Sequence, residues 1–437
     1  MSLPVGPTLR AFAARVASRG REVTSTLSAE IVVLVSMAVT FPLITRGLGV
    51  DLYGKYTVLY LISGLAGLWV FAAPSAAAVQ LILQLDRESA KVRRLGRRQV
   101  LVTAAPVAVV GTAVVVGLYG SSMLAPAILV LAVDFILSGL ANIELAVIFS
   151  VDGVVRSTRI RILHPALRAA GVVALAVGGV ITIVSLVSVN IAASAVLYLC
   201  SRRAGRRPRR SAELGTSDPR AAELVRYSSF YATSMSTNAV QNEGEKVVLA
   251  STRPSAEVGQ YAAAYRIVSL TLVPFSAVLA AANRWFLMRD EREGAQLARA
   301  ARLFVPITLY GVVASAAIFL GRNMIQWVAG SEFDEVATIA AWLCLLPLLH
   351  GLAELPPMGL LGLGRNRERM LMGFATSAVA LCAYLLLVPS LGWRGAVIGT
   401  YLSETAAIIA GWVLLARYQR IADRRTQLVV PASTSPA

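Results

Sequence analysis

Twelve apolar stretches, each about as long as a membrane span, dominate this sequence. A helix needs about 20 apolar residues to cross a hydrocarbon core of about 30 Å. Of the 437 residues, 57% are hydrophobic and only 15% are charged, whereas soluble domains are about half apolar and a quarter charged. We therefore expect an all-α polytopic membrane protein with no room for a soluble catalytic domain. The stretches lie at about 27–47, 56–82, 99–119, 125–149, 162–178, 180–200, 228–250, 259–283, 303–321, 336–360, 371–388 and 396–416.

The basic residues collect on one side of these predicted spans. If the N-terminus is cytoplasmic, 33 of the 41 Lys and Arg residues fall in cytoplasmic connections, five in outer connections and three within spans. Short loops rich in Lys and Arg stay in the cytoplasm. The net charge of +17 therefore indicates about twelve transmembrane helices with both termini cytoplasmic, and it does not indicate nucleic-acid binding.

Two predicted outer corners, one in each half of the chain, resemble each other at an offset of 205 residues. Six spans per half would make the halves parallel repeats, related about the membrane normal. Pro74 and Pro274 also fall at similar places in the second and eighth spans, where proline can bend a helix. The matching residues are Gly54, Tyr56, Tyr60 and Ile62 in the first corner and Gly259, Tyr261, Tyr265 and Ile267 in the second.

This duplication predicts four segments along the chain. Residues 1–200 form an N-terminal six-helix bundle, and 228–417 form a C-terminal six-helix bundle. Residues 201–227, rich in Arg, Ser, Gly and Pro, form a basic cytoplasmic linker of the flexible kind. Residues 418–437 form a cytoplasmic tail. Bundles of this kind usually hold their substrate in a cavity between the repeats.

Nine ionisable residues lie within the predicted spans. Each costs about 2.5–3.5 kcal/mol at the centre of a bilayer, so nine of them facing lipid would exceed the usual stability of a domain, about 5–15 kcal/mol. We therefore expect them to face a water-filled cavity or one another. They are Asp134, Glu144, Arg168, Glu243, Glu245, Lys246, Arg266, Glu354 and Glu404.

Span 7 is the most polar span and supplies half of the predicted substrate-binding residues. Polar residues at i, i+3, i+4 and i+7 share one face of a helix. Lys246 joins this face, and a cation there suits an anionic headgroup; an ion pair with Glu243 is the alternative. The predicted substrate-binding residues are Arg168, Lys246, Arg266, Glu245, Asn238, Asn242, Tyr60 and Tyr265.

Two carboxyl groups near mid-depth are the predicted ion- or proton-coupling sites. Asp134 and Glu404 lie far from either end of their spans, where burial favours proton binding. The two tyrosines of the substrate set, Tyr60 and Tyr265, could stack on sugar rings, and anchoring at the membrane interface is the alternative.

The sequence patterns that would suggest catalysis or a cofactor are incomplete. Residues 49–56 nearly fit the phosphate-binding pattern G-x-x-x-x-G-K-[ST], but Tyr56 stands at the last position and no strand precedes the loop. His350 and Glu354 are spaced at i, i+4, but two ligands without a third do not make a metal site. The sequence predicts no catalytic residue, metal or cofactor, and it indicates a transporter driven by a gradient.

Three short segments carry a resemblance to a known family. Arg46-Gly47-Leu48-Gly49 with Tyr53-Gly54-x-Tyr56 resembles the first outer corner of bacterial polysaccharide flippases, the O-antigen and exopolysaccharide members of the multidrug/oligosaccharidyl-lipid/polysaccharide (MOP) transporter superfamily. The run from Glu245 to Leu249 followed by Glu257 to Arg266 is similar to the matching corner after span 7, although the family usually has Asp where Glu245 stands. Val388-Pro389-x-x-Gly392-x-x-Gly395-Ala396 before Ser403-Glu404 resembles the entry to the last span.

The resemblance implies two six-helix bundles around a cationic cavity and a location in the bacterial plasma (inner) membrane. It implies that an undecaprenyl-diphosphate-linked oligosaccharide moves from the inner to the outer leaflet by alternating access, with ion or proton coupling. Its expected partners are the polyprenyl-diphosphate-linked glycan, membrane lipids, and a glycan polymerase or glycosyltransferases, without nucleic acid. Two alternatives stay open: a small-molecule or drug exporter of the same superfamily, and a non-transporting scaffold for glycan enzymes.

Overall fold

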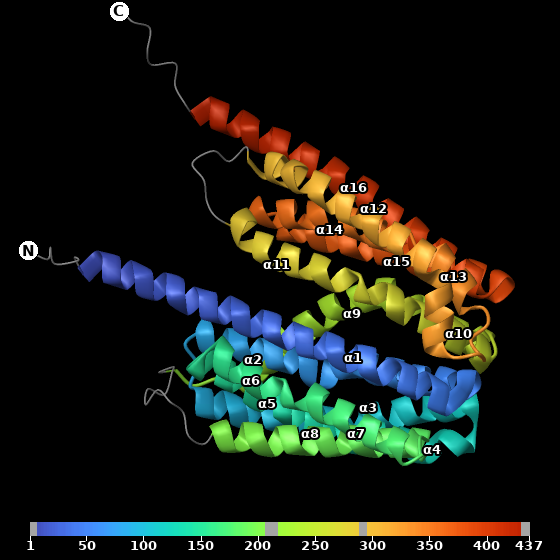
Figure 1. The fold of residues 1–437 in the computed structure, drawn as a ribbon. Coiled ribbons are helices and arrows are strands. Elements are labelled where there is room, and N and C mark those ends of the chain that lie inside the picture. The colour runs from blue at the N-terminus through green and yellow to red at the C-terminus, as the bar shows by residue number, and fades with distance from the viewer. Residues whose placement is uncertain (1–6, 206–216, 288–294, 430–437) are drawn as a thin grey trace, which may run out of the picture. The chain divides into compact units, whose positions relative to one another are not determined.

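The computed structural model describes residues 7–205, 217–287 and 295–429. These ranges are almost entirely helical, and their only extended pairing is an isolated parallel bridge between Arg87 and Ser217. The elements, labelled as in Figure 1, are α1 (Pro7–Gly67), η1 (Leu68–Ala72), α2 (Ala73–Leu83), α3 (Ser89–Tyr119), η2 (Ser121–Met123), α4 (Leu124–Ile128), η3 (Leu129–Asp134), α5 (Phe135–Asp152), α6 (Val154–Arg161), α7 (Leu163–Val177), α8 (Ile183–Gly205), α9 (Ala221–Thr252), α10 (Ser255–Leu270), α11 (Leu272–Leu287), α12 (Ala295–Ala329), α13 (Val336–Leu343), α14 (Leu346–Gly362), α15 (Asn366–Leu391) and α16 (Trp393–Val429).

Nine helical segments among the described residues are long and apolar enough to cross a membrane. The first of them, Ser28–Leu83, is 56 residues long and contains two of the predicted spans. The predicted spans at 228–250 and 259–283 are not among the nine. Helix α9 is rich in Ser, Thr, Asn and Gln, and the other span is divided into α10 and α11, of 16 residues each. The described helices thus follow all twelve predicted spans in order.

Helices break where glycine or proline interrupts the regular hydrogen-bond pattern. In α1 the chain turns at Gly49, whose φ of 72° is a left-handed conformation that glycine adopts at little cost. Ahead of Pro74 the helix widens into the π-helical turn η1. Ahead of Pro274 it is interrupted at Thr271, between α10 and α11. The predicted bends in the second and eighth spans therefore appear as local breaks just before each proline.

The helices form two compact units. Unit 1 comprises residues 1–48 and 59–235, and unit 2 comprises residues 49–58 and 236–437. Helix α9 contributes its first turns to unit 1 and its later turns to unit 2. The ten residues 49–58 of α1 pack with the helices that follow residue 236. The domain boundaries predicted from the sequence stay predictions.

In unit 1 the core joins α2, α3, α5 and the start of α9. Its centre includes Leu81, Val92, Val147 and Leu224, all nearly or completely buried. Helix α5 also packs against α8 and α7 against α8. Because Leu224 belongs to this core, the first turns of α9 are part of unit 1.

Polar contacts fasten the segment that leads into α9 to the connection between α2 and α3. The Arg87 guanidinium donates to the Ser217 hydroxyl at 2.9 Å and pairs with Glu223 at 2.7 Å. The Glu88 amide donates to the Ser217 carbonyl at 3.1 Å, and Lys91 pairs with Asp218. We call these contacts between residues 86–91 and 217–223 the clasp.

In unit 2 the core lies among α11, α12, α14 and α16. Phe275, Ile307, Leu355 and Leu415 are buried within it, and α15 packs along α16.

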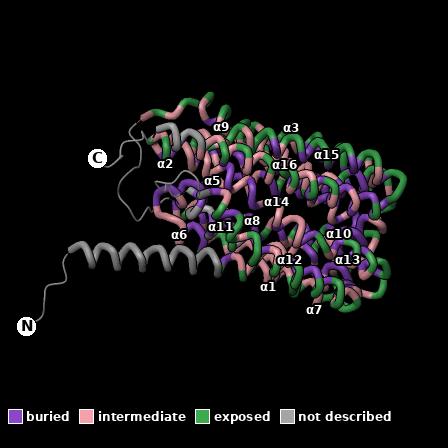
Figure 2. Tube along the Cα trace, turned by 90° about the horizontal axis from the view of Figure 1, so that it is seen from above, coloured by how far each residue is buried: buried purple, intermediate pink, exposed green. Residues whose placement is uncertain are grey.

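In both units, many large apolar side chains are strongly exposed, among them Val110 of unit 1 and Leu320 and Leu386 of unit 2. Figure 2 shows exposed positions alternating with buried ones along the helices, which is the pattern expected of helices that face lipid on one side.

Candidate functional site

In unit 1 a cation lies over an aromatic ring. Arg168 on α7 places its guanidinium carbon 5.7 Å from the centroid of the Tyr60 ring, which α1 supplies. Both residues are half-buried. A guanidinium over a tyrosine face is attracted by the ring quadrupole. The pair thus offers charge and an aromatic surface together.

Asp134 ends the π-helical turn η3 in the same unit and is buried. Its Oδ1 accepts hydrogen bonds from Ser194 on α8 at 2.6 Å and from Ser138 on α5 at 3.4 Å. His164 on α7 reaches Ser194 through Nε2 at 3.3 Å. Polar side chains of α5 and α8 therefore surround this carboxyl group, and His164, one helical turn before Arg168 on α7, extends the cluster through Ser194.

In unit 2 Lys246 lies at the centre of a second polar cluster. Its ammonium is 2.7 Å from Glu243 Oε2 and 3.0 Å from Glu245 Oε1, and it donates to the Asn242 carbonyl at 3.3 Å. It also lies 3.6 Å from the centroid of the Tyr265 ring. The ion pair with Glu243, which was the alternative for this lysine, is present in the structure.

Glu245 is the most deeply buried member of this cluster, at 1% exposure. Glu245 forms an ion pair with Lys246. Neither oxygen of the Glu245 carboxylate accepts a hydrogen bond from the described residues. A buried carboxylate held by one cation alone carries a large desolvation cost. This cluster therefore has unused acceptors as well as a buried positive charge.

Two tyrosines at equivalent positions of the two repeats each lie beside a cation, although the cations come from non-equivalent helices, α7 and α9. Tyr60 and Tyr265 are separated by the 205-residue offset of the duplicated corners. One carries Arg168 over its ring and the other carries Lys246. Each unit therefore has one cation beside one tyrosine, and in unit 2 that cation is also paired with Glu243 and Glu245.

Glu404 on α16 pairs with a histidine from another helix. His350 on α14 brings Nδ1 to 2.9 Å from Glu404 Oε1, and Glu404 is buried. Tyr384 and Thr400 form a neighbouring contact of 3.3 Å between α15 and α16. This carboxyl group, predicted as a coupling site, therefore has an ionisable partner that can share a proton.

Three other predicted intramembrane polar residues lie elsewhere. Asn238 is exposed on α9 and Arg266 is exposed on α10. Glu144 is completely buried, and it pairs with Arg97 and, at 3.5 Å, with Arg93, both from the first turns of α3. Glu144 thus belongs to a structural ion pair in unit 1.

Two histidines belong to these clusters although they were not predicted as site residues. His164 stands four residues before Arg168, so both lie on one face of α7, and this spacing could have revealed it. His350 was considered only with Glu354, its neighbour at i+4, whereas it pairs with Glu404 across helices. Local spacing carries no signal for that tertiary contact.

Comparison with known proteins agrees with this architecture. Residues 43–338 match the family described as polysaccharide biosynthesis protein. The chain belongs to this family. No curated protein matches the sequence.

Several solved structures share the fold of this chain. An inward-facing multidrug-resistance MATE transporter of the MOP superfamily has a TM-score of 0.71 at 14% identity, with 89% of this chain and 95% of that chain covered. The lipid II flippase MurJ, in an inward closed conformation, also has a TM-score of 0.71, at 10% identity, with 93% and 90% covered. A MOP transporter from Pyrococcus furiosus, described as having a binding pocket of reverse polarity, has a TM-score of 0.60 at 14% identity, with 91% and 97% covered.

These matches confirm the predicted family resemblance and the predicted fold class. The chain is an all-α, multi-pass membrane protein with the two-repeat helical fold found in MOP transporters.

Proposed function

We propose that this protein flips an undecaprenyl-diphosphate-linked oligosaccharide from the inner to the outer leaflet of the bacterial plasma membrane. The termini would be cytoplasmic, and the substrate would alternate between access from the two sides. Membership of the polysaccharide biosynthesis family favours a glycan over a drug as cargo. A glycan polymerase or glycosyltransferases would be its functional partners.

The observation that carries this proposal is a cation over each of two repeat-related tyrosines. Arg168 with Tyr60 and Lys246 with Tyr265 each combine a positive charge with an aromatic face. A diphosphate needs cations, and the sugar next to it can pack on an aromatic ring. Asn242 and Glu245 would accept hydrogen bonds from sugar hydroxyls, and Arg266 and Asn238 would extend the polar path along α10 and α9.

Ion or proton coupling would use the two buried carboxyl groups, one in each unit. Asp134 is held by serines, and Glu404 is held by His350. Protonation of either group would change the charge at its contacts with neighbouring helices. The populations of the conformational states of that unit would then shift. One elementary charge crossing 100 mV supplies about 2.3 kcal/mol, so a few ions suffice for one turnover.

The test is a variant in which Arg168, Lys246 and Arg266 are all changed to Gln. Lipid-linked sugar accessible from each leaflet is measured in membrane vesicles by enzymatic labelling. We expect the variant to accumulate lipid-linked sugar on the cytoplasmic leaflet. Arg226→Gln is the matched control, because Arg226 also lies over a tyrosine, Tyr227, at 5.1 Å, but in the predicted cytoplasmic linker.

Two outcomes would reject the proposal. If the triple variant is inserted normally and exports glycan at the rate of the unmodified protein, a scaffold for glycan enzymes becomes the better explanation. If the unmodified protein in vesicles moves cationic drugs and leaves lipid-linked sugar in place, a drug exporter becomes the better explanation.

A further inference from the structure

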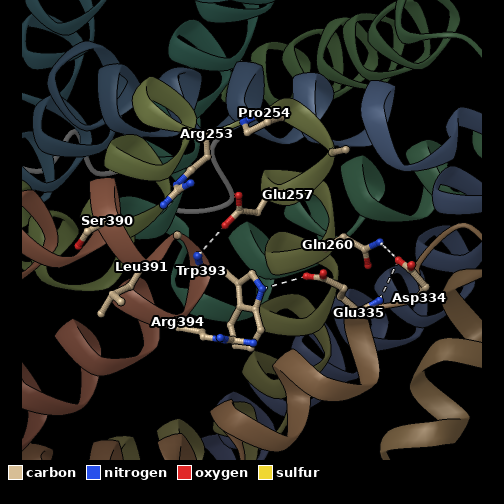
Figure 3. Close-up of a pocket in the computed structure, with 12 residues that line it drawn as sticks. Arg253, Pro254, Glu257, Gln260, Asp334, Glu335, Ser390, Leu391, Trp393 and Arg394 are labelled. Carbon is tan, nitrogen blue, oxygen red and sulfur yellow. Dashed lines mark hydrogen bonds between the residues drawn. The ribbon is translucent and has the colours of Figure 1, made fainter.

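A second polar cavity lies within unit 2, apart from the Lys246 cluster. It has a volume of about 550 Å³, within the range of small-molecule sites. Its walls come from three connections at one end of the unit: α9 to α10, α12 to α13, and α15 to α16 (Figure 3). All three are predicted to be outer connections. We call it the corner pocket, defined by Arg253, Glu257, Gln260, Glu335, Trp393 and Arg394.

The acidic residues of the corner pocket are already held by protein donors. Glu257 Oε1 accepts the Trp393 backbone amide at 2.8 Å, and Glu335 Oε2 accepts the Trp393 indole at 2.9 Å. Asp334 Oδ1 accepts the Gln260 amide at 2.7 Å. Each carboxylate is thereby fixed in place, and each keeps lone pairs that can accept further hydrogen bonds.

The cations of the corner pocket have donors to spare. Arg253 uses Nη2 for the Pro389 carbonyl at 3.0 Å, and its buried Nε makes no hydrogen bond with the described residues. Arg394 is exposed and lies with its guanidinium carbon 5.3 Å from the Trp393 ring centroid. Stacking of this kind leaves the donor edge of a guanidinium available to a carboxylate.

Gln260 carries a buried, unpaired acceptor at the corner pocket. The residue is only 6% exposed, its amide nitrogen is bound to Asp334 and the Glu332 carbonyl, and its Oε1 has no hydrogen-bond partner among the described residues. A buried polar atom left unpaired costs about 1–3 kcal/mol. A ligand hydroxyl in the pocket would satisfy it.

We propose that the corner pocket binds an acidic sugar. Three carboxylates and two guanidinium groups disfavour a bare anion, whereas sugar hydroxyls can donate to Glu257, Glu335 and Gln260. A carboxylate on the same sugar would meet the free edges of Arg253 and Arg394.

This inference rests on the proposed function, because a glycan flipped outward would emerge on the side of the three outer connections. The corner pocket would then hold a uronate-type sugar of the arriving glycan. An exported glycan free of lipid presents the same chemistry, so the ligand is defined by its acidic sugar and its source is decided by experiment.

The test measures binding to the purified full-length protein in nanodiscs by saturation-transfer NMR. The probes are a disaccharide that contains glucuronate, the corresponding glucose disaccharide, inorganic phosphate, and the acidic disaccharide on a short polyprenyl diphosphate. We expect the acidic disaccharide to bind, and we expect Arg394→Gln to raise its Kd by about tenfold, the scale of one charge-assisted contact. Arg322→Gln is the matched control, since Arg322 stacks on Phe319 at 4.4 Å outside the pocket and should leave the Kd unchanged.

The outcomes separate this inference from the proposed function. Equal binding of both disaccharides, displacement of the acidic one by phosphate, or no effect of both Arg394→Gln and Arg253→Gln overturns the corner pocket and leaves the flippase proposal standing. The triple variant of Arg168, Lys246 and Arg266 should still bind the soluble acidic disaccharide; loss of binding there would also overturn the inference. If the lipid-linked probe binds more tightly than the soluble acidic disaccharide, the pocket is supported and its ligand is the arriving substrate. If the two bind with equal affinity, the pocket is supported and its ligand is the released glycan.

Discussion

Gly54 and Gly259 pack against each other in a reciprocal contact within unit 2. A Cβ on Gly54 would lie 1.9 Å from the Ser255 carbonyl oxygen, and a Cβ on Gly259 would lie 2.2 Å from the Val50 carbonyl oxygen. Each glycine thus meets the residue four positions before the other. The 205-residue offset that relates the two corners in sequence also relates the two sides of this contact, so the repeated corners touch through equivalent atoms.

Alanine at this contact should destabilise the protein. Because the obstructing atoms are backbone carbonyls, Gly54→Ala must push the two corners apart, and we expect a loss of about 1–3 kcal/mol, the usual cost of overpacking. Thermal unfolding in detergent measures it. Gly64→Ala is the control, since a Cβ on Gly64 in the same helix meets nothing within 4 Å, and it should be neutral or stabilising. Equal unfolding temperatures for the two variants would contradict the reciprocal contact.

Arg97→Ala should lower the stability of unit 1. Glu144 is completely buried, and removal of Arg97 leaves it with the longer ion pair to Arg93, at 3.5 Å. We expect a loss of about 2 kcal/mol, the scale of a hydrogen bond to a charged group. Arg94→Ala changes an exposed residue of the same helix and should leave the unfolding midpoint unchanged. A shift of equal size in both variants would show that the buried carboxylate does not depend on Arg97.

Lys246→Met should impair both folding and transport, and a second change should separate the two effects. The single variant leaves Glu245 buried beside no cation of its own cluster, at a cost of about 3–5 kcal/mol. The double variant Lys246→Met/Glu245→Gln removes that charge and should recover most of the stability. Flipping should stay lost, since the cation over Tyr265 is still absent. Recovered flipping in the double variant would remove Lys246 from the substrate site.

Glu404→Gln should uncouple transport from the ion gradient. The amide can still meet His350 but cannot exchange a proton, so flipping in vesicles should no longer respond to an imposed gradient. Binding of lipid-linked sugar should change by less than about threefold, within the range of a modest neutral contact. Glu354→Gln, a half-buried residue of α14, is the comparison and should keep the gradient response. An unchanged response in Glu404→Gln would exclude this carboxyl group from coupling.

The sequence was sufficient to predict the spans and the fold class, because apolar length and loop charge are local properties. It also predicted that span 7 would be exceptional: the polar residues of α9 keep that helix outside the nine most apolar segments. The resemblance of the two corners was visible as an offset of 205 residues. The contact between Gly54 and Gly259 could not be predicted, because periodicity within each segment says nothing about contact between the two segments.

The candidate site was predicted in part, and its pairings were not. Lys246, Glu245, Asn242 and Tyr265 do lie together, because three of them are neighbours on one helix. His350 pairs with Glu404 rather than with Glu354, which was four residues away in sequence. Glu144 was expected with the polar pathway but pairs with arginines of α3. These choices depend on which helices pack side by side, which a single sequence does not state.

The clasp determines where this chain could be cut into separately expressed pieces. A division at residue 228 leaves Glu223 and the core residue Leu224 in the N-terminal piece, but it cuts α9 within the part that belongs to unit 1. A division before residue 217 keeps α9 whole and gives the C-terminal piece the hydrogen-bonding edge that recognises residues 86–91. We therefore expect co-expressed fragments divided before residue 217 to reassemble without a covalent join, and fragments divided at residue 228 to fail.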